Sequence, residues 1–138
     1  MPFGKNTPRS SCPIVCSLDL LGDRWTLVVL RDVLLRQRRV FSEIAVDEGI
    51  ATSTLTNRLD RLIAAGVLER RQDPKDGRSR KYIPTQCGLE LIPVLVDLMI
   101  WGMKYTSGTR SEETLVRAVS DREAFLAEFI ERARETDS

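Results

Sequence analysis

The side chains best suited to contact a nucleic acid lie on one face of residues 52–65. In a helix of about 100° per residue, the apolar side chains of this segment form one narrow stripe: Leu55, Leu59, Leu62 and Ile63. The outer and flanking positions are Thr52, Ser53, Thr56, Asn57, Arg58 and Arg61. Short hydroxyl and amide groups can hydrogen-bond to base edges, and arginine can pair with guanine or bind phosphate. The pattern predicts a recognition helix for the DNA major groove. The alternative is a core helix whose outer face only meets water.

A basic hairpin is predicted directly after that helix. Gly66 is a natural helix terminator, strands are expected at residues 68–72 and 80–83, and the five residues between 73 and 77, Asp-Pro-Lys-Asp-Gly, have strong turn chemistry. The cations of the hairpin are Lys75, Arg78, Arg80 and Lys81. Beside a recognition helix, such a hairpin can place positive charge along the DNA backbone or in the minor groove. The alternative is an ordinary β-turn whose charges only prevent edge pairing.

The distribution of charge favours a nucleic-acid partner for this region. The 138 residues carry a formal net charge of only +1, but residues 36–85 hold eleven Lys and Arg against seven Asp and Glu. Residues 107–138 hold five against eight. The basic excess therefore falls where phosphate contacts would be needed.

Caps and apolar periodicity predict the helices before this motif. Pro13 fits the first turn of a helix that Gly22 ends, and Asp23 caps a second helix whose apolar positions extend to residue 34. A short strand edge is expected at residues 40–41. Ser42 is a good N-cap for the first helix of the helix-turn-helix, and Gly49 suits the turn.

The same signals predict the helices after the hairpin. Thr85 can cap a helix that extends to about Tyr105, and Pro93 inside it predicts a kink. A short helix is expected from residue 111 to 119. The residues from Ser120 to Glu123 form a capping box, so a last helix is expected to begin at position 121.

The composition argues against an enzyme. The chain has no histidine, so a His-based general base or triad is impossible, and no glycine-rich phosphate loop is present. Three cysteines without histidine make a poor metal site. We therefore expect no catalysis, no metal and no cofactor. No secretory signal is visible, and charges interrupt the apolar stretches. The expectation is a cytoplasmic protein with no membrane-spanning segment.

Short motifs follow one another in a fixed order between residue 12 and about residue 103. They are Cys12-Pro13-Ile14, Leu21-Gly-Asp-Arg-Trp25-Thr, Leu30-Arg-Asp-Val-Leu, Phe41-Ser-Glu-Ile, Gly49-Ile50, Leu55-Thr-Asn-Arg-Leu59, Ala65-Gly66-Val-Leu-Glu-Arg70, Tyr82-Ile-Pro-Thr85, Gly88 and Leu91-Ile-Pro-Val-Leu95. Together they resemble the HxlR-type winged-helix transcriptional regulators, a branch close to the MarR regulators. The resemblance implies a mainly α fold with a small β-wing, and a homodimer that binds a double-stranded DNA operator of two-fold symmetry.

The resemblance also implies a division of the chain. The polar, proline-containing residues 1–10 are expected to form a flexible tail. The winged-helix domain comprises residues 11–106, with the helix-turn-helix at about 42–65 and the wing at about 67–84. Dimerisation falls on residues 13–21 and 86–105, with these expected contacts: Ile14, Leu18, Leu95, Met99, Ile100 and Met103. Residues 107–138 form a C-terminal helical extension that the resemblance does not cover. The wing is more like that of MarR proteins, and Ala51 stands where serine is common in the family.

Cys12 is a candidate redox thiol. It occupies the position at which some members of the resembled family carry a redox-sensing cysteine, and a helix N-terminus favours the nucleophilic thiolate. Cys16 lies one turn away, but a disulfide within one helix is strained, so bonding across a dimer is the better hypothesis. The alternative is that both are small buried apolar residues. Cys87 is expected to be structural.

The sequence thus predicts a homodimeric, sequence-specific transcriptional regulator that responds to an oxidant or a small-molecule effector. Two alternatives remain. One is a thiol-based redox sensor acting through Cys12 with DNA binding as its output, and the other is a winged-helix module that docks proteins and does not bind DNA.

Overall fold

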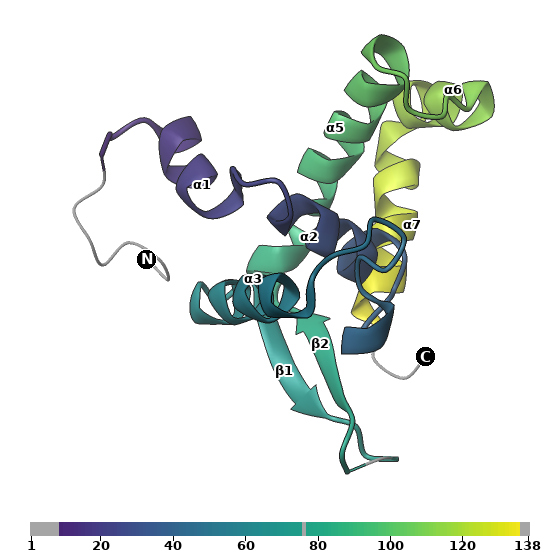
Figure 1. Ribbon diagram of the computed structural model, residues 1–138. Helices are drawn as coiled ribbons and strands as arrows, with labels where there is room; N and C mark the ends of the chain where they lie inside the picture. The colour runs from purple at the N-terminus through teal and green to yellow at the C-terminus, as the bar shows by residue number, and fades with distance from the viewer. Residues whose placement is uncertain (1–8, 76, 136–138) are drawn as a thin grey trace.

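The computed structural model describes residues 9–75 and 77–135 and shows a mainly helical fold with one two-stranded hairpin (Figure 1). Its helices are α1 (Pro13–Leu21), α2 (Thr26–Leu35), the 3-10 helix η1 (Phe41–Glu43), α3 (Thr52–Ala64), α4 (Gln86–Leu89), α5 (Ile92–Tyr105), α6 (Glu112–Ser120) and α7 (Arg122–Arg134). The strands are β1 (Leu68–Gln72) and β2 (Arg80–Pro84). This architecture confirms the predicted fold class.

The hairpin and the helix before it form as the sequence predicts. Gly66 ends α3 in the left-handed region at φ +78°, and the N–H of Val67 then donates to the carbonyl of Leu62 at 2.9 Å. The strands pair antiparallel, with Leu68 opposite Pro84 and Gln72 opposite Arg80. Val40 adds an isolated bridge to Lys81, which confirms the predicted strand edge at that residue.

The first helix of the helix-turn-helix is not formed as an α-helix. Only η1 and a series of turns occupy the segment, and Ser42 is exposed and does not cap a helix. The predicted N-cap is therefore wrong. The cause lies outside the segment: the carboxylate of Asp32, fully buried on α2, accepts from the N–H of Ala45 at 2.7 Å. Ala45 has φ +56°, and Ile44 before it is extended, so the chain leaves the helical path there.

Two further expectations need correction. The predicted single helix after the wing is divided into α4 and α5, and Pro93 lies in the first turn of α5, where its missing N–H costs nothing. Thr85 does cap α4, because its Oγ1 accepts from the N–H of Gly88 at 3.2 Å. The capping box at Ser120 is not formed: that hydroxyl donates backwards to the carbonyl of Val116 at 2.6 Å.

The C-terminal extension packs on the core. Helix α7 runs beside α2 and α5 (Figure 1), and its Phe125 and Ala133 are buried. Arg122 joins α7 to α5 through two hydrogen bonds to Asp97, at 2.6 and 3.0 Å. Arg39, which is buried before η1, donates to the carbonyl of Ala133 at 2.8 Å. The extension is thus part of the same body as α2 and α5.

One segment is more apolar than the sequence prediction allowed. By length and composition alone, Gln86–Tyr105 is long and apolar enough to cross a membrane, so the expectation that no segment could do so is wrong on those criteria. In the structure the segment is interrupted between α4 and α5. Its buried side chains Ile92, Leu95 and Val96 belong to the core.

Candidate nucleic-acid interface

Helix α3 has the two faces that its sequence predicts. Leu55, Leu59 and Leu62 are buried against the core. Outside this stripe, Ser53 and Asn57 on the far side and Thr52 and Thr56 on its flank are all exposed. These four short side chains from the first two turns form a polar surface that is accessible without any change in the fold.

The two arginines of α3 are held against the protein. Arg58 donates from Nε to Oδ1 of Asp23 at 2.8 Å and from Nη1 to Oδ1 of Asn57 at 2.6 Å. Arg61 donates to the backbone carbonyl of Asp19 at 3.2 Å and lies 3.7 Å from the carboxylate of Asp23. The structure therefore separates the predicted contacts of this helix into an exposed polar group and two arginines paired at the corner between α1 and α2.

Asp23 is the centre of this corner. Burial raises the pKa of the Asp23 carboxyl, but hydrogen bonds from the Thr26 hydroxyl, from Arg58 and from the backbone N–H groups of Trp25 and Thr26 outweigh it. The pKa therefore lies well below its ordinary value. The backbone bonds, 2.8 and 3.0 Å long, satisfy two N–H groups at the start of α2, although the N-cap residue of that helix is Trp25 and not Asp23 as predicted. The same carboxylate thus begins one helix and holds the arginines of another.

The hairpin places further cations beside α3. Lys75, Arg78 and Arg80 are exposed, and Lys81 is half-buried. Asp73 closes the turn, because its carboxylate accepts from the N–H of Lys75 at 2.9 Å. Residue 76 lies outside the described residues.

One basic residue of this surface was missed from the sequence. Arg70 on β1 joins Arg78 and Arg80 around an open cleft of about 420 Å³. Its guanidinium binds Asp60 of α3 at 2.7 Å and lies over the ring of Tyr82, 5.6 Å from its centroid. Arg70 therefore connects the recognition helix to the wing. Its position on the strand that follows the helix is a signal that could have identified it.

The residues predicted for a dimer interface are divided by the structure. Ile14 and Leu18 on α1 are exposed, at 70% and 50%. Leu95 and Met103 are buried inside the protomer, so their assignment to an interface is corrected, whereas Met99 and Ile100 are half-buried. The exposed apolar residues of α5 are different ones: Val94, Leu98, Trp101 and Tyr105. They were missed because α5 is apolar on nearly all sides, and its sequence does not show which stripe faces the core.

The three cysteines are free thiols. Cys12 is exposed at the N-terminus of α1, so the alternative of a buried apolar residue is wrong for this position. Cys16 is half-buried and donates to the carbonyl of Ser10 at 3.3 Å. Cys87 is exposed in the first turn of α4.

Comparison with known proteins gives consistent matches. The family model of HxlR-like helix-turn-helix proteins matches residues 20–110. The uncharacterised HTH-type transcriptional regulator Rv3095 of Mycobacterium tuberculosis is 37% identical over 89 residues, which are 64% of this chain and 56% of that protein. The chain thus spans little more than half the length of that relative.

Solved structures agree on the fold. PA1607, a candidate transcription factor, aligns with a TM-score of 0.66 and 30% identity over 75% of this chain and 72% of that one. A MarR-family regulator from Porphyromonas gingivalis W83 aligns with a TM-score of 0.62 over 73% of this chain and 99% of that one. The second is only 21% identical, so it supports the winged-helix fold alone.

Proposed function

Because the chain belongs to the HxlR-like helix-turn-helix family, we propose that it is a homodimeric regulator of transcription that binds a DNA operator of two-fold symmetry. The observation that supports this most directly is the exposed polar surface of α3, residues Thr52, Ser53, Thr56 and Asn57, above its buried leucines. In this proposal those side chains contact base edges in the major groove. Lys75, Arg78, Arg80 and Lys81 of the wing contact the backbone.

Arg58 and Arg61 of α3 also contact the DNA in this proposal. Asp23 and the backbone carbonyl of Asp19 hold Arg58 and Arg61 in the free protein. DNA phosphates offer competing acceptors with a high local charge, so Arg58 and Arg61 exchange Asp23 for phosphate on binding. In the same way, Arg70 at the cleft beside the wing exchanges Asp60 for a phosphate.

The proposed dimer uses the exposed apolar faces of α1 and α5. Helix α1 projects to one side of the body (Figure 1), and its Ile14 and Leu18 are open to solvent. Exposed apolar surface of this kind marks interaction sites. A two-fold dimer through α1 and α5 would present the two α3 helices to half-sites about 34 Å apart.

Selection of bound sites from a random duplex pool tests the proposal. The expected product is an inverted repeat with half-sites about one duplex turn apart. A titration of random duplex at two salt concentrations measures the electrostatic part of the binding. The logarithm of the association constant should fall with the logarithm of the salt concentration, with a slope of about −0.9 per phosphate contacted. Absence of any salt-dependent binding would instead support the protein-docking module.

A redox response through Cys12 is a second proposal, favoured by the exposure of that thiol on the helix assigned to the dimer. In it, oxidation by a quinone or hypochlorite joins Cys12 of two protomers. A non-reducing gel should then show a dimer that Cys12→Ser abolishes and Cys87→Ser retains. Cross-linking that persists in the Cys12→Ser variant would remove this residue as the sensor.

A further inference from the structure

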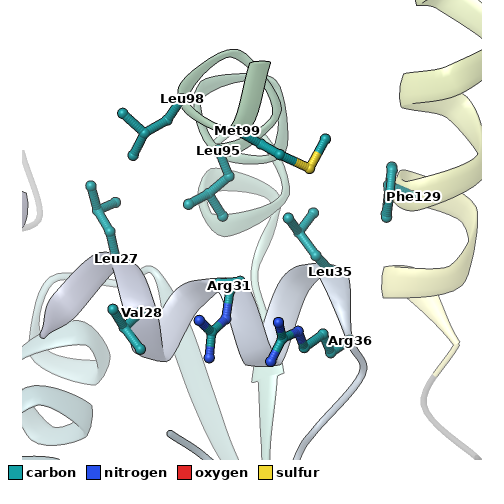
Figure 2. A pocket seen from close by; sticks show the side chains of 9 residues that line it. All are labelled: Leu27, Val28, Arg31, Leu35, Arg36, Leu95, Leu98, Met99 and Phe129. Carbon is teal, nitrogen blue, oxygen red and sulfur yellow. The ribbon is translucent and has the colours of Figure 1, made fainter. Parts of the chain in front are cut away.

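An open pocket of about 500 Å³ lies between α2, α5 and α7, outside the surfaces assigned to DNA. Figure 2 shows Leu27 and Leu35 of α2 pointing toward Leu95 of α5, with Met99 and Phe129 facing each other across the far side. Val28 and Leu98 complete an almost wholly apolar lining, and Leu98 also belongs to the exposed face of α5 assigned to the dimer, so the pocket borders that surface. Pockets of this size and character are typical of small-molecule sites.

The third wall of the pocket comes from a part of the chain that the family model does not match. Phe129 lies on α7, whereas the match ends at residue 110. The ring of Phe129 is fixed by an edge-on contact with Phe125, with 5.2 Å between centroids, and Arg132 covers it at 4.6 Å. The pocket is therefore partly built by the C-terminal extension.

Arg31 of α2 and Arg36, the residue directly after α2, both line the pocket, and they differ in their partners. Arg31 uses both terminal nitrogens on Glu48, at 2.7 and 3.0 Å, and its Nε on Asp32 at 3.0 Å. Arg36 is held loosely: within the described ranges, its Nη1 makes two contacts of 3.4 Å, to Asp32 and Asp47. Arg36 is thus the cation at this pocket that can accept a new anionic partner at least cost.

We propose that this pocket binds a small hydrophobic carboxylate, with its apolar body between Leu35, Leu95 and Phe129 and its carboxylate on Arg36. The apolar lining favours a ligand with an apolar body, and the weakly held guanidinium favours a ligand with a negative charge. The role of this ligand as the effector of a DNA-binding regulator rests on the function proposed above.

A route to α3 is present in the same contacts. Asp47 and Glu48, the partners of Arg36 and Arg31, stand in the turn that leads to α3. When a ligand carboxylate pairs with Arg36, Asp47 loses that partner and keeps only the hydrogen bond that Arg38 Nη1 donates to its Oδ2 at 3.2 Å. The ligand therefore changes the ion pairs of the turn that precedes α3, and we expect DNA affinity to change with it.

Calorimetric titration of the full chain in the absence of DNA tests the site. The probes are ibuprofen, an aryl-alkyl carboxylate, and its uncharged primary amide. We expect one ibuprofen per protomer, bound about tenfold more tightly than the amide because of the charged hydrogen bond. Arg36→Gln should remove that advantage and leave amide binding unchanged. Arg110→Gln, the same loss of charge on an exposed arginine outside the pocket, should change neither.

Several outcomes would overturn the assignment. They are no binding by the wild type, equal weakening by Arg36→Gln and Arg110→Gln, and ibuprofen binding that disappears as protein concentration rises, since a second copy would then fill the groove. Phe129→Ala should weaken both probes, and a circular dichroism melt checks that it folds. Because no DNA is present, failure here is separate from failure to bind an operator. A second titration, of DNA with and without ibuprofen, measures the regulation.

Discussion

Helices α3 and α5 have similar lengths, but their solvent-facing sides differ in polarity. Both bury a row of apolar side chains, such as Leu55 and Leu59 on α3 and Leu95 and Val96 on α5. The outer face of α3 carries short polar side chains, whereas that of α5 carries Trp101, which is 57% exposed, and other large apolar residues. Polar groups are already satisfied by water, but an apolar stripe gains free energy only when it is covered. Only the outer face of α5 therefore requires a cover, which the proposed dimer supplies, whereas the polar face of α3 can stay in water until it meets the proposed duplex.

The largest expected effect comes from the buried side of α3. Leu59→Ala should lower the free energy of unfolding by about 2–5 kcal/mol, because it removes a fully packed side chain and leaves a cavity. Urea denaturation measures it. Thr56→Ala, one turn earlier on the exposed face, is the control and should change the stability by less than about 0.5 kcal/mol. Equal losses would abolish the distinction between the two faces of α3.

The next effect belongs to the outer face of α5. Trp101→Ala should weaken the proposed dimer by about 2 kcal/mol or more, because large aromatic residues dominate such interfaces. Its dissociation constant would rise about thirtyfold, measured by sedimentation equilibrium. Lys104→Ala, three residues on, is the matched control. If Trp101→Ala leaves the dissociation constant unchanged while the fold is intact, α5 does not carry the interface.

Local signals were enough to predict α3 and the hairpin. The stripe of leucines repeats at helical spacing, Gly66 terminates the helix, and the turn after β1 contains the residue types that favour a turn. Long-range contacts explain the failures. Asp32, thirteen residues before Ala45 in the chain, redirects the segment expected to be the first helix of the motif.

The candidate site shows the same division. The exposure of Ser53 and Asn57 follows from periodicity, which the sequence displays. The pairing of Arg58 with Asp23 joins positions 35 residues apart and has no local signature. The exposed stripe of α5 was also hidden, because the choice of inner face depends on where α2 and α7 pack.

The next test separates base contacts made by the polar face of α3 from phosphate contacts made by the wing. Asn57→Ala should reduce discrimination between operator and random duplex by about 1–3 kcal/mol, because an amide can read a base edge. Arg78→Ala on the wing should weaken binding to all sequences alike and reduce the salt slope by about 1. Fluorescence anisotropy with both duplexes at several salt concentrations separates the two. If both variants lose specificity equally, the assigned roles are wrong.

The smallest expected effect tests the corner that joins the recognition helix to the rest of the protein. Asp23→Ala should lower the free energy of unfolding by about 0.5–2 kcal/mol at neutral pH, because the N–H groups of Trp25 and Thr26 at the start of α2 lose their acceptor. The pKa of Asp23 is lowered in the folded state, so its contribution is complete above the unfolded pKa of about 3.9 and is lost progressively as the pH falls below that value. The difference between wild type and variant should therefore shrink in acid, as urea denaturation at several pH values would measure.

Asp23 also distinguishes folding from DNA binding, because the two should change in opposite directions. The substitution removes the carboxylate that holds Arg58 and lies near Arg61, so both guanidinium groups become available to phosphate. Binding to random duplex should tighten although the fold is weaker. Asp19→Ala, which removes a surface ion pair with Arg9 and leaves the hydrogen bonds of Asp23 intact, should change stability by less than about 1 kcal/mol. If Asp23→Ala weakens binding to random duplex while the protein remains folded, the corner positions α3 for DNA and does not compete with DNA for its arginines.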